Sequence, residues 1–76
     1  MTKKLNQCQN GDRVVVKSLS MNDEKSKRLM DMGLLPGTFL EVIKISPFGS
    51  LLIIKLRGFK LSFRIMEAEN ILVEII

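Results

Sequence analysis

Short runs of apolar residues follow one another along the chain, and residues typical of turns separate them. Runs of this length and spacing are typical of an all-β barrel or sandwich. Pro36-Gly37 suits a type II turn with the glycine at positive φ, and Gly58-Phe59 suits a tight reversal. The pattern predicts five strands, at residues 12–19, 38–46, 51–57, 60–65 and 71–76.

Alternation within a strand indicates which side chains face the core. The fourth predicted strand alternates regularly, with Leu61, Phe63 and Ile65 inward and polar residues outward. The first strand holds consecutive valines at 14–16, so we expect it to be buried on both faces or to lie under a cover.

Residues 22–32 carry a helical pattern. Asn22 suits the N-cap, and Leu29 and Met32 lie three positions apart, as an inward stripe requires. Gly33 supplies the left-handed residue that commonly ends a helix. A helix this short is not stable alone in water, so we expect it to pack onto the sheet.

These elements predict a mainly β fold, a small SH3-like barrel of five strands. The inserted helix spans about residues 22–32, and a segment too short for a regular helix, about 66–70, predicts a 3-10 turn. A chain of 76 residues suffices for one core, so residues 1–76 are expected to form a single domain.

The composition favours a surface that binds another molecule. Hydrophobic residues make up 46% of the chain, more than so small a core can enclose. Large exposed apolar patches mark binding surfaces, although small domains also expose more apolar atoms for purely geometric reasons. The net charge of +4 is scattered along the chain without a basic run, which argues against a nucleic-acid-binding arm.

The single cysteine and the absence of long apolar segments indicate the compartment. Cys8 has no partner for an intramolecular disulfide, and no apolar stretch follows Lys3 and Lys4 as in a secretory signal. The apolar runs fall far short of the ~20 residues that span a bilayer. We therefore expect a cytoplasmic protein that meets a membrane only through a partner.

The chain lacks the residues that most enzymes use. It contains no histidine, one cysteine, and no Gly-Lys-Ser/Thr phosphate loop. We expect no catalytic site, cofactor or metal, and interpret Cys8 as a small buried hydrophobic residue.

Two functions common on small barrels are also disfavoured. Recognition of proline-rich peptides needs a groove lined by aromatic residues, and binding of single-stranded nucleic acid needs aromatic platforms among basic residues. The chain has no tryptophan, no tyrosine and four phenylalanines, of which Phe63 and Phe39 are expected in the core.

Apolar residues at corners and hairpin tips are the best candidates for partner contact. Leu34 and Leu35 lie between Gly33 and Pro36, where one side chain can face inward and the other cannot. Phe48 and Phe59 occupy hairpin tips, which are normally polar. The alternative is that they fold back over the open ends of the barrel. Such tips also allow weak self-association.

The segment RLMDMGLLPGTFLEVIKISPFGSLLIIKLRGFKLSFRIMEAENILVE closely resembles the FeoA family of small cytosolic accessory proteins in bacterial ferrous iron uptake. The features that carry the resemblance are the helix end with Gly-Leu-x-Pro-Gly, the Pro-x-Gly turn at 47–49, and the two strands that follow it. Leu5, Cys8 and Gly11 resemble the family's N-terminal lead-in. The resemblance implies that FeoB, the transporter with a cytosolic GTP-binding domain, is the partner.

A similar pattern occurs in the C-terminal domain of metal-dependent transcriptional repressors, so a regulatory domain acting on such a repressor is the alternative. A further hypothesis is that Arg28, Arg57 or Arg64 acts on the GTPase of the transporter as an arginine finger. The simpler interpretation is that these arginines are solvated. Arg57 completes the predicted partner-binding set of Leu34, Leu35, Phe48 and Phe59.

Overall fold

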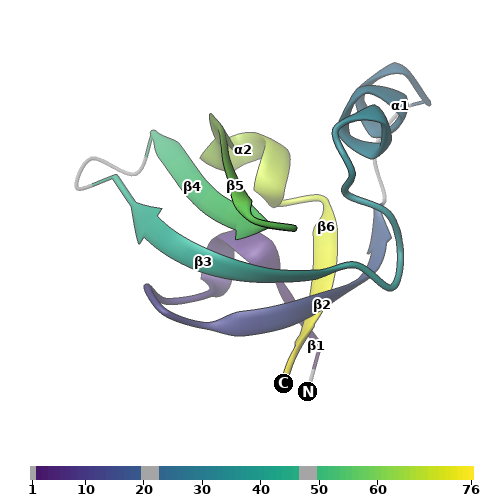
Figure 1. Ribbon diagram of the computed structural model, residues 1–76. Helices are drawn as coiled ribbons and strands as arrows, with labels where there is room; N and C mark the ends of the chain where they lie inside the picture. The colour runs from purple at the N-terminus through teal and green to yellow at the C-terminus, as the bar shows by residue number, and fades with distance from the viewer. Residues whose placement is uncertain (1, 20–22, 47–49) are drawn as a thin grey trace.

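The computed structural model describes residues 2–19, 23–46 and 50–76. The strands of these residues form one antiparallel sheet in the order β1-β6-β2-β3-β4-β5 (Figure 1). In chain order the elements are β1 (Thr2–Lys4), the 3-10 helix η1 (Leu5–Gln7), β2 (Arg13–Leu19), α1 (Asp23–Asp31), β3 (Phe39–Ile45), β4 (Leu51–Leu56), β5 (Phe59–Arg64), α2 (Ile65–Ala68) and β6 (Ile71–Ile75).

The predicted mainly β, SH3-like fold is confirmed, with one strand more than expected. The additional strand, β1, is short and mostly polar, so it carries no apolar signal. It is defined instead by its pairing with β6, in which Lys3 lies opposite Val73. Register shifts in β2 between Val16 and Ser18, and in β3 between Val42 and Lys44, mark irregularities of the kind that bend a sheet.

The segment predicted as a 3-10 turn at 66–70 is instead a single α-helical turn, α2. Ile65 and Ala68 lie three positions apart in this turn and therefore on one face. Ala68 is fully buried and Ile65 packs against the core. Burial of this face accounts for the turn, since the segment is too short to form a helix alone.

The helix α1 fulfils its predicted pattern. Leu29 is fully buried, Met32 packs against the core, and Met30 is exposed on the flank. The expected N-cap, Asn22, lies outside the described residues. In Figure 1, α1 stands beyond one end of the sheet, and the Arg28 guanidinium lies 3.4 Å from the Glu67 carboxylate of α2. No described helix has the length and apolar content needed to cross a membrane.

A Schellman motif ends α1. Gly33 has φ +103°, and its amide donates to the carbonyl of Met30 at 2.9 Å. The amide of Leu34 donates to the carbonyl of Leu29 at 3.0 Å, which closes the wider ring of the motif. These bonds turn the chain sharply at Gly33 and direct Leu34 into the barrel.

The core fills the inside of the barrel with side chains from nearly every element. In β2, Val14 and Val16 are buried and Val15 is only partly covered, so the strand is buried on one face rather than on both. Each large side chain buried in this way contributes about 1.5–3 kcal/mol relative to exposure. The buried apolar residues are Leu5, Cys8, Val14, Val16, Leu29, Leu34, Leu40, Val42, Leu52, Ile54, Leu56, Phe63, Ala68, Ile71 and Val73.

Replacing Gly33 by alanine tests the end of α1. The positive φ disfavours an L side chain by about 1–2 kcal/mol, and a Cβ at this position would lie 3.2 Å from Cδ1 of the buried Leu56. Gly37→Ala is the matched control, because Gly37 has φ +92° but no atom within 4 Å of its added Cβ. Urea unfolding should show a larger loss of stability for Gly33→Ala. Equal losses would contradict the tight contact with Leu56.

Candidate functional site

The corner between α1 and β3 separates two consecutive leucines. Leu34 is fully buried, whereas Leu35 is 42% exposed. The turn that follows is of type II, as expected: the amide of Thr38 donates to the carbonyl of Leu35 at 3.0 Å, and Gly37 has positive φ. One leucine thus faces inward and the other outward. Leu34 is a core residue and does not belong to the predicted partner-binding surface.

Backbone bonds to β2 hold this corner in place. The amide of Gly37 donates to the carbonyl of Val16 at 2.7 Å, and the amide of Val16 donates to the carbonyl of Thr38 at 2.9 Å. The hydroxyl of the buried Thr38 donates back to the carbonyl of Gly33 at 3.2 Å. Leu35 is therefore presented to solvent by a backbone fixed on both sides.

The hairpin between β4 and β5 turns one residue earlier than predicted. Leu56 lies opposite Phe59, so the two turn residues are Arg57 and Gly58. Both have positive φ, +50° and +88°, which is characteristic of a type I′ turn. Asparagine or glycine is normal at the first of these positions. An arginine held there carries backbone strain of the kind that clusters at functional sites.

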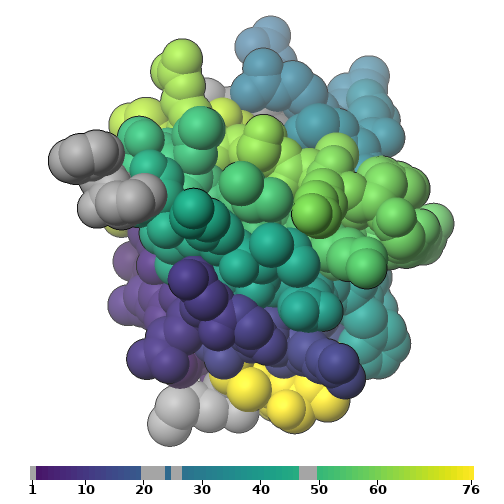
Figure 2. All heavy atoms as spheres, turned by 60° about the vertical axis from the view of Figure 1, so that its left-hand side comes forward, coloured from purple at the N-terminus to yellow at the C-terminus, as the bar shows by residue number. Residues whose placement is uncertain are grey.

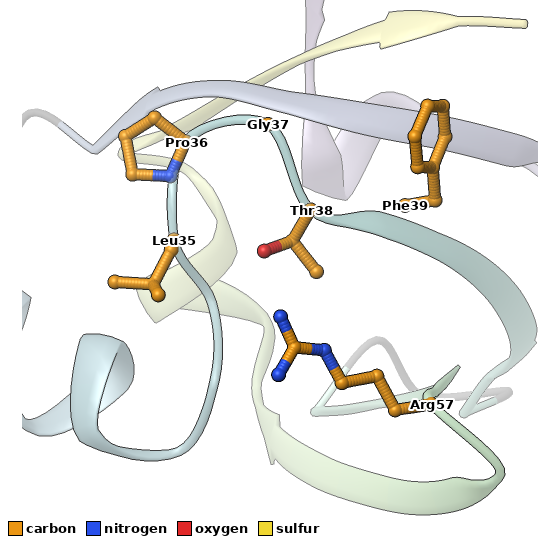
Figure 3. A pocket seen from close by; sticks show the side chains of 6 residues that line it. All are labelled: Leu35, Pro36, Gly37, Thr38, Phe39 and Arg57. Atoms are coloured by element: carbon orange, nitrogen blue, oxygen red, sulfur yellow. The ribbon is translucent and has the colours of Figure 1, made fainter.

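The corner and the hairpin border an open hollow of about 450 Å³ (Figure 3). Arg57 reaches across it, and its guanidinium points towards Thr38 and Leu35. The guanidinium forms no ion pair or hydrogen bond with any residue that the structure describes. The residues around the hollow are Leu35, Pro36, Gly37, Thr38, Phe39 and Arg57.

Phe39 corrects the sequence prediction, because it is 65% exposed and not part of the core. On β3 it shares its face with Glu41, while Leu40 and Val42 point inward. Glu41, two positions along the strand, was the sequence signal that Phe39 faces solvent. Its ring points away from the guanidinium of Arg57 (Figure 3), and the residue lines a second hollow as well.

The second hollow, of about 260 Å³, adjoins the first, since Phe39 and Arg57 line both. Its lining residues come mainly from β2, β3 and the β4–β5 hairpin, which lie in successive bands in Figure 2. The register places Glu41 opposite Arg13 on one side and Lys55 on the other. Among the described lining residues, the cationic side chains thus outnumber the one acidic side chain.

Of the remaining predicted residues, those that the structure describes do not line these two hollows. Phe59 is 53% exposed at the start of β5 and lines neither hollow. Phe48 lies outside the described residues. Of the other arginines, Arg28 is paired with Glu67, and Arg64 lines a third hollow between η1 and α2.

Cys8 is a buried residue of the core, as predicted. The residue is 3% exposed, and its Sγ contacts the carbonyl of Lys4 at 3.9 Å. Burial, and secondarily the charge of Asp12, raises the pKa of the thiol, although Lys3 acts in the opposite direction. Among the residues that the structure describes, no group of three or more His, Cys, Asp or Glu side chains could hold a metal ion.

The strain at Arg57 predicts a stabilising substitution. Arg57→Asn places in the left-handed region a residue that tolerates it, so the free energy of unfolding should rise by about 1 kcal/mol. Urea unfolding of the two proteins measures the difference. A loss of stability would show that Arg57 makes interactions that outweigh the strain of its backbone.

The buried thiol predicts a pH dependence. Because the folded pKa of Cys8 lies above the unfolded one, the native state is favoured fully below the unfolded pKa and loses stability as pH rises beyond about 8.5. Unfolding free energies at increasing pH should decline more steeply for the wild type than for Cys8→Val. Parallel curves would contradict the shift.

Comparison with known proteins places this geometry in a family. The sequence model of the FeoA domain matches residues 3–75. No curated protein matches the chain significantly. The FeoA protein from Chlorobium tepidum, solved by NMR, is 36% identical with a TM-score of 0.90, over 97% of this chain and 70% of that one.

Two further solved structures share the fold. A crystal structure of an iron uptake regulatory protein, FeoA, is 25% identical with a TM-score of 0.88, over 100% of this chain and 99% of that one. A manganese-dependent transcriptional repressor superposes with a TM-score of 0.91 at 18% identity, over 99% of this chain and 37% of that one, a likeness that shows the fold alone. The match of the family model across the six-stranded barrel shows that the chain belongs to the FeoA domain family, which is implicated in iron transport.

Proposed function

We propose that this protein is a cytoplasmic accessory protein of bacterial ferrous iron uptake, which binds the cytosolic GTP-binding region of the transporter FeoB and modulates it. The observation that carries the proposal is the docking face, which we define as Leu35, Pro36, Phe39 and Arg57. Two large apolar side chains of this face, Leu35 and Phe39, are 42% and 65% exposed beside an arginine without a described partner.

The composition of the docking face supports a protein partner. Interfaces are enriched in aromatic residues and arginine, and a few such residues provide most of the binding energy. Leu35 and Pro36 extend from a corner fixed by hydrogen bonds to β2, so their ordering costs little on association. Phe59, on the same hairpin as Arg57, is a further exposed aromatic side chain.

Family membership supports the choice of partner and compartment. The FeoA family is implicated in iron transport, and contact with the membrane would then occur only through the transporter. The alternative, action on a metal-dependent repressor, rests on a likeness at 18% identity and gains no support from the docking face. Neither catalysis nor nucleic-acid binding is part of this proposal, whereas weak self-association through the exposed apolar residues is compatible with it.

Leu35→Ser and Phe39→Ser should each weaken binding to the cytosolic domain of FeoB by about tenfold or more, because each removes an exposed apolar anchor. Isothermal titration with and without guanine nucleotide measures the affinity. The GTP hydrolysis rate of the same mixtures shows whether the complex alters the transporter's activity.

Leu51→Ser is the matched control, because Leu51 is 45% exposed and lines none of the three hollows. It should leave the affinity nearly unchanged. Failure of the wild-type chain to bind would overturn the proposed function. An equal loss in all three variants would instead place the interface elsewhere on the protein.

A further inference from the structure

Most of the hydrogen-bond donors around the hollow beneath the corner are already engaged. The amides of Leu35, Gly37 and Thr38 donate to carbonyls of the protein, and Pro36 has no N–H. The hydroxyl of Thr38 donates to the carbonyl of Gly33. The guanidinium of Arg57, in contrast, has no acceptor among the described residues, although it points into the hollow (Figure 3).

The backbone of Arg57 is held in the less favourable left-handed region, with φ +50°. It is the one residue other than glycine with positive φ in the part of the chain that the structure describes. A residue that opposes the local turn preference without an internal contact to compensate is more readily explained by binding than by stability.

The surroundings favour a negatively charged ligand. Arg13 and Lys55 line the adjoining hollow, where Glu41 is the only acidic side chain among the described lining residues. The register sets Glu41 opposite both of these cations, so two positive side chains flank one negative side chain here. Arg57 therefore stands at the edge of a surface with excess positive charge, and beside the apolar side chain of Leu35.

We propose that this hollow binds the carboxylate of an Asp or Glu side chain on the partner protein, held by both arms of the Arg57 guanidinium, with an apolar neighbour of that residue against Leu35 and Pro36. The inference rests on the proposed function and adds the chemistry of the partner's contact residue. The partner's segment is thus acidic and apolar at adjacent positions.

A carboxylate fits this site better than a phosphate group. A planar guanidinium matches the two oxygens of a carboxylate through parallel hydrogen bonds. A phosphate presents more oxygens and is normally held by several backbone amides or basic side chains together. The amides of Leu35, Gly37 and Thr38 are already engaged, and Arg57 is the only basic residue among the described residues around this hollow.

Charge-neutral substitution of Arg57 tests the contact. Arg57→Gln should weaken binding to the cytosolic domain of FeoB by about tenfold to a hundredfold, because a hydrogen bond to a charged group is lost. Arg64→Gln removes the same charge from an exposed site in the third hollow and should change the affinity by less than about threefold. Arg57→Lys keeps the charge without the planar fork and should recover only part of the loss.

Equal effects of Arg57→Gln and Arg64→Gln would overturn the inference, since only net charge would then matter. Full recovery by Arg57→Lys would overturn the two-armed contact. Arg57→Asn, which relieves the backbone strain, should bind as weakly as Arg57→Gln while remaining folded by circular dichroism. Its loss of affinity cannot then be attributed to unfolding, and wild-type affinity would overturn the proposal.

A small-molecule titration tests the hollow without the transporter. N-acetyl-leucine should shift the Arg57 side-chain Nε–H resonance of the isotope-labelled chain saturably, whereas N-acetyl-leucinamide should not. Equal shifts with the amide, or a stronger response to inorganic phosphate at equal ionic strength, would overturn carboxylate recognition. If the transporter domain fails to bind, the proposed function fails alone, and this titration still decides the chemistry of the hollow.

Discussion

The structure depends on the corner at which α1 passes into β3. The amide of Leu34 bonds to the carbonyl of Leu29, and Gly37 and Thr38 exchange bonds with Val16 of β2. These bonds fix the chain on both sides of two consecutive leucines. One must then fill the end of the barrel, and the other must face water. The same backbone bonds therefore determine both the core position of Leu34 and the exposure of Leu35 in the proposed docking face.

Stability and binding impose different demands on the residues around the hollow. Gly33 and Gly37 adopt the positive φ that their turns require, and neither has a side chain that could contact another molecule. Arg57 costs stability, because it occupies a turn position that asparagine or glycine would fill more favourably. Its charged side chain extends into an open hollow, where it is available for binding. The rigid corner supplies apolar surface at low entropic cost, and the hairpin supplies a charge free to pair with another molecule.

The barrel alone does not define the role of the protein. A manganese-dependent repressor shares the fold at 18% identity, whereas FeoA proteins share both fold and closer sequence. Differences in function must therefore be sought in the exposed side chains. Here the candidates are the exposed Leu35 and Phe39 and the strained Arg57, next to the basic side chains of the second hollow.

Local chemistry in the sequence determined the turn at Pro36-Gly37, the helix end at Gly33 and the inward face of β5, since each follows from the preferences of a few adjacent residues. The polar strand β1 could not be predicted because its pairing with β6, rather than its composition, makes it a strand. From the sequence we predicted Phe39 in the core. In the structure it lies opposite Val15 of β2 and on the same face as Glu41, so its side chain faces solvent. Only tertiary packing brought Leu35 and Arg57 to one hollow, because they belong to separate elements and no local preference links them.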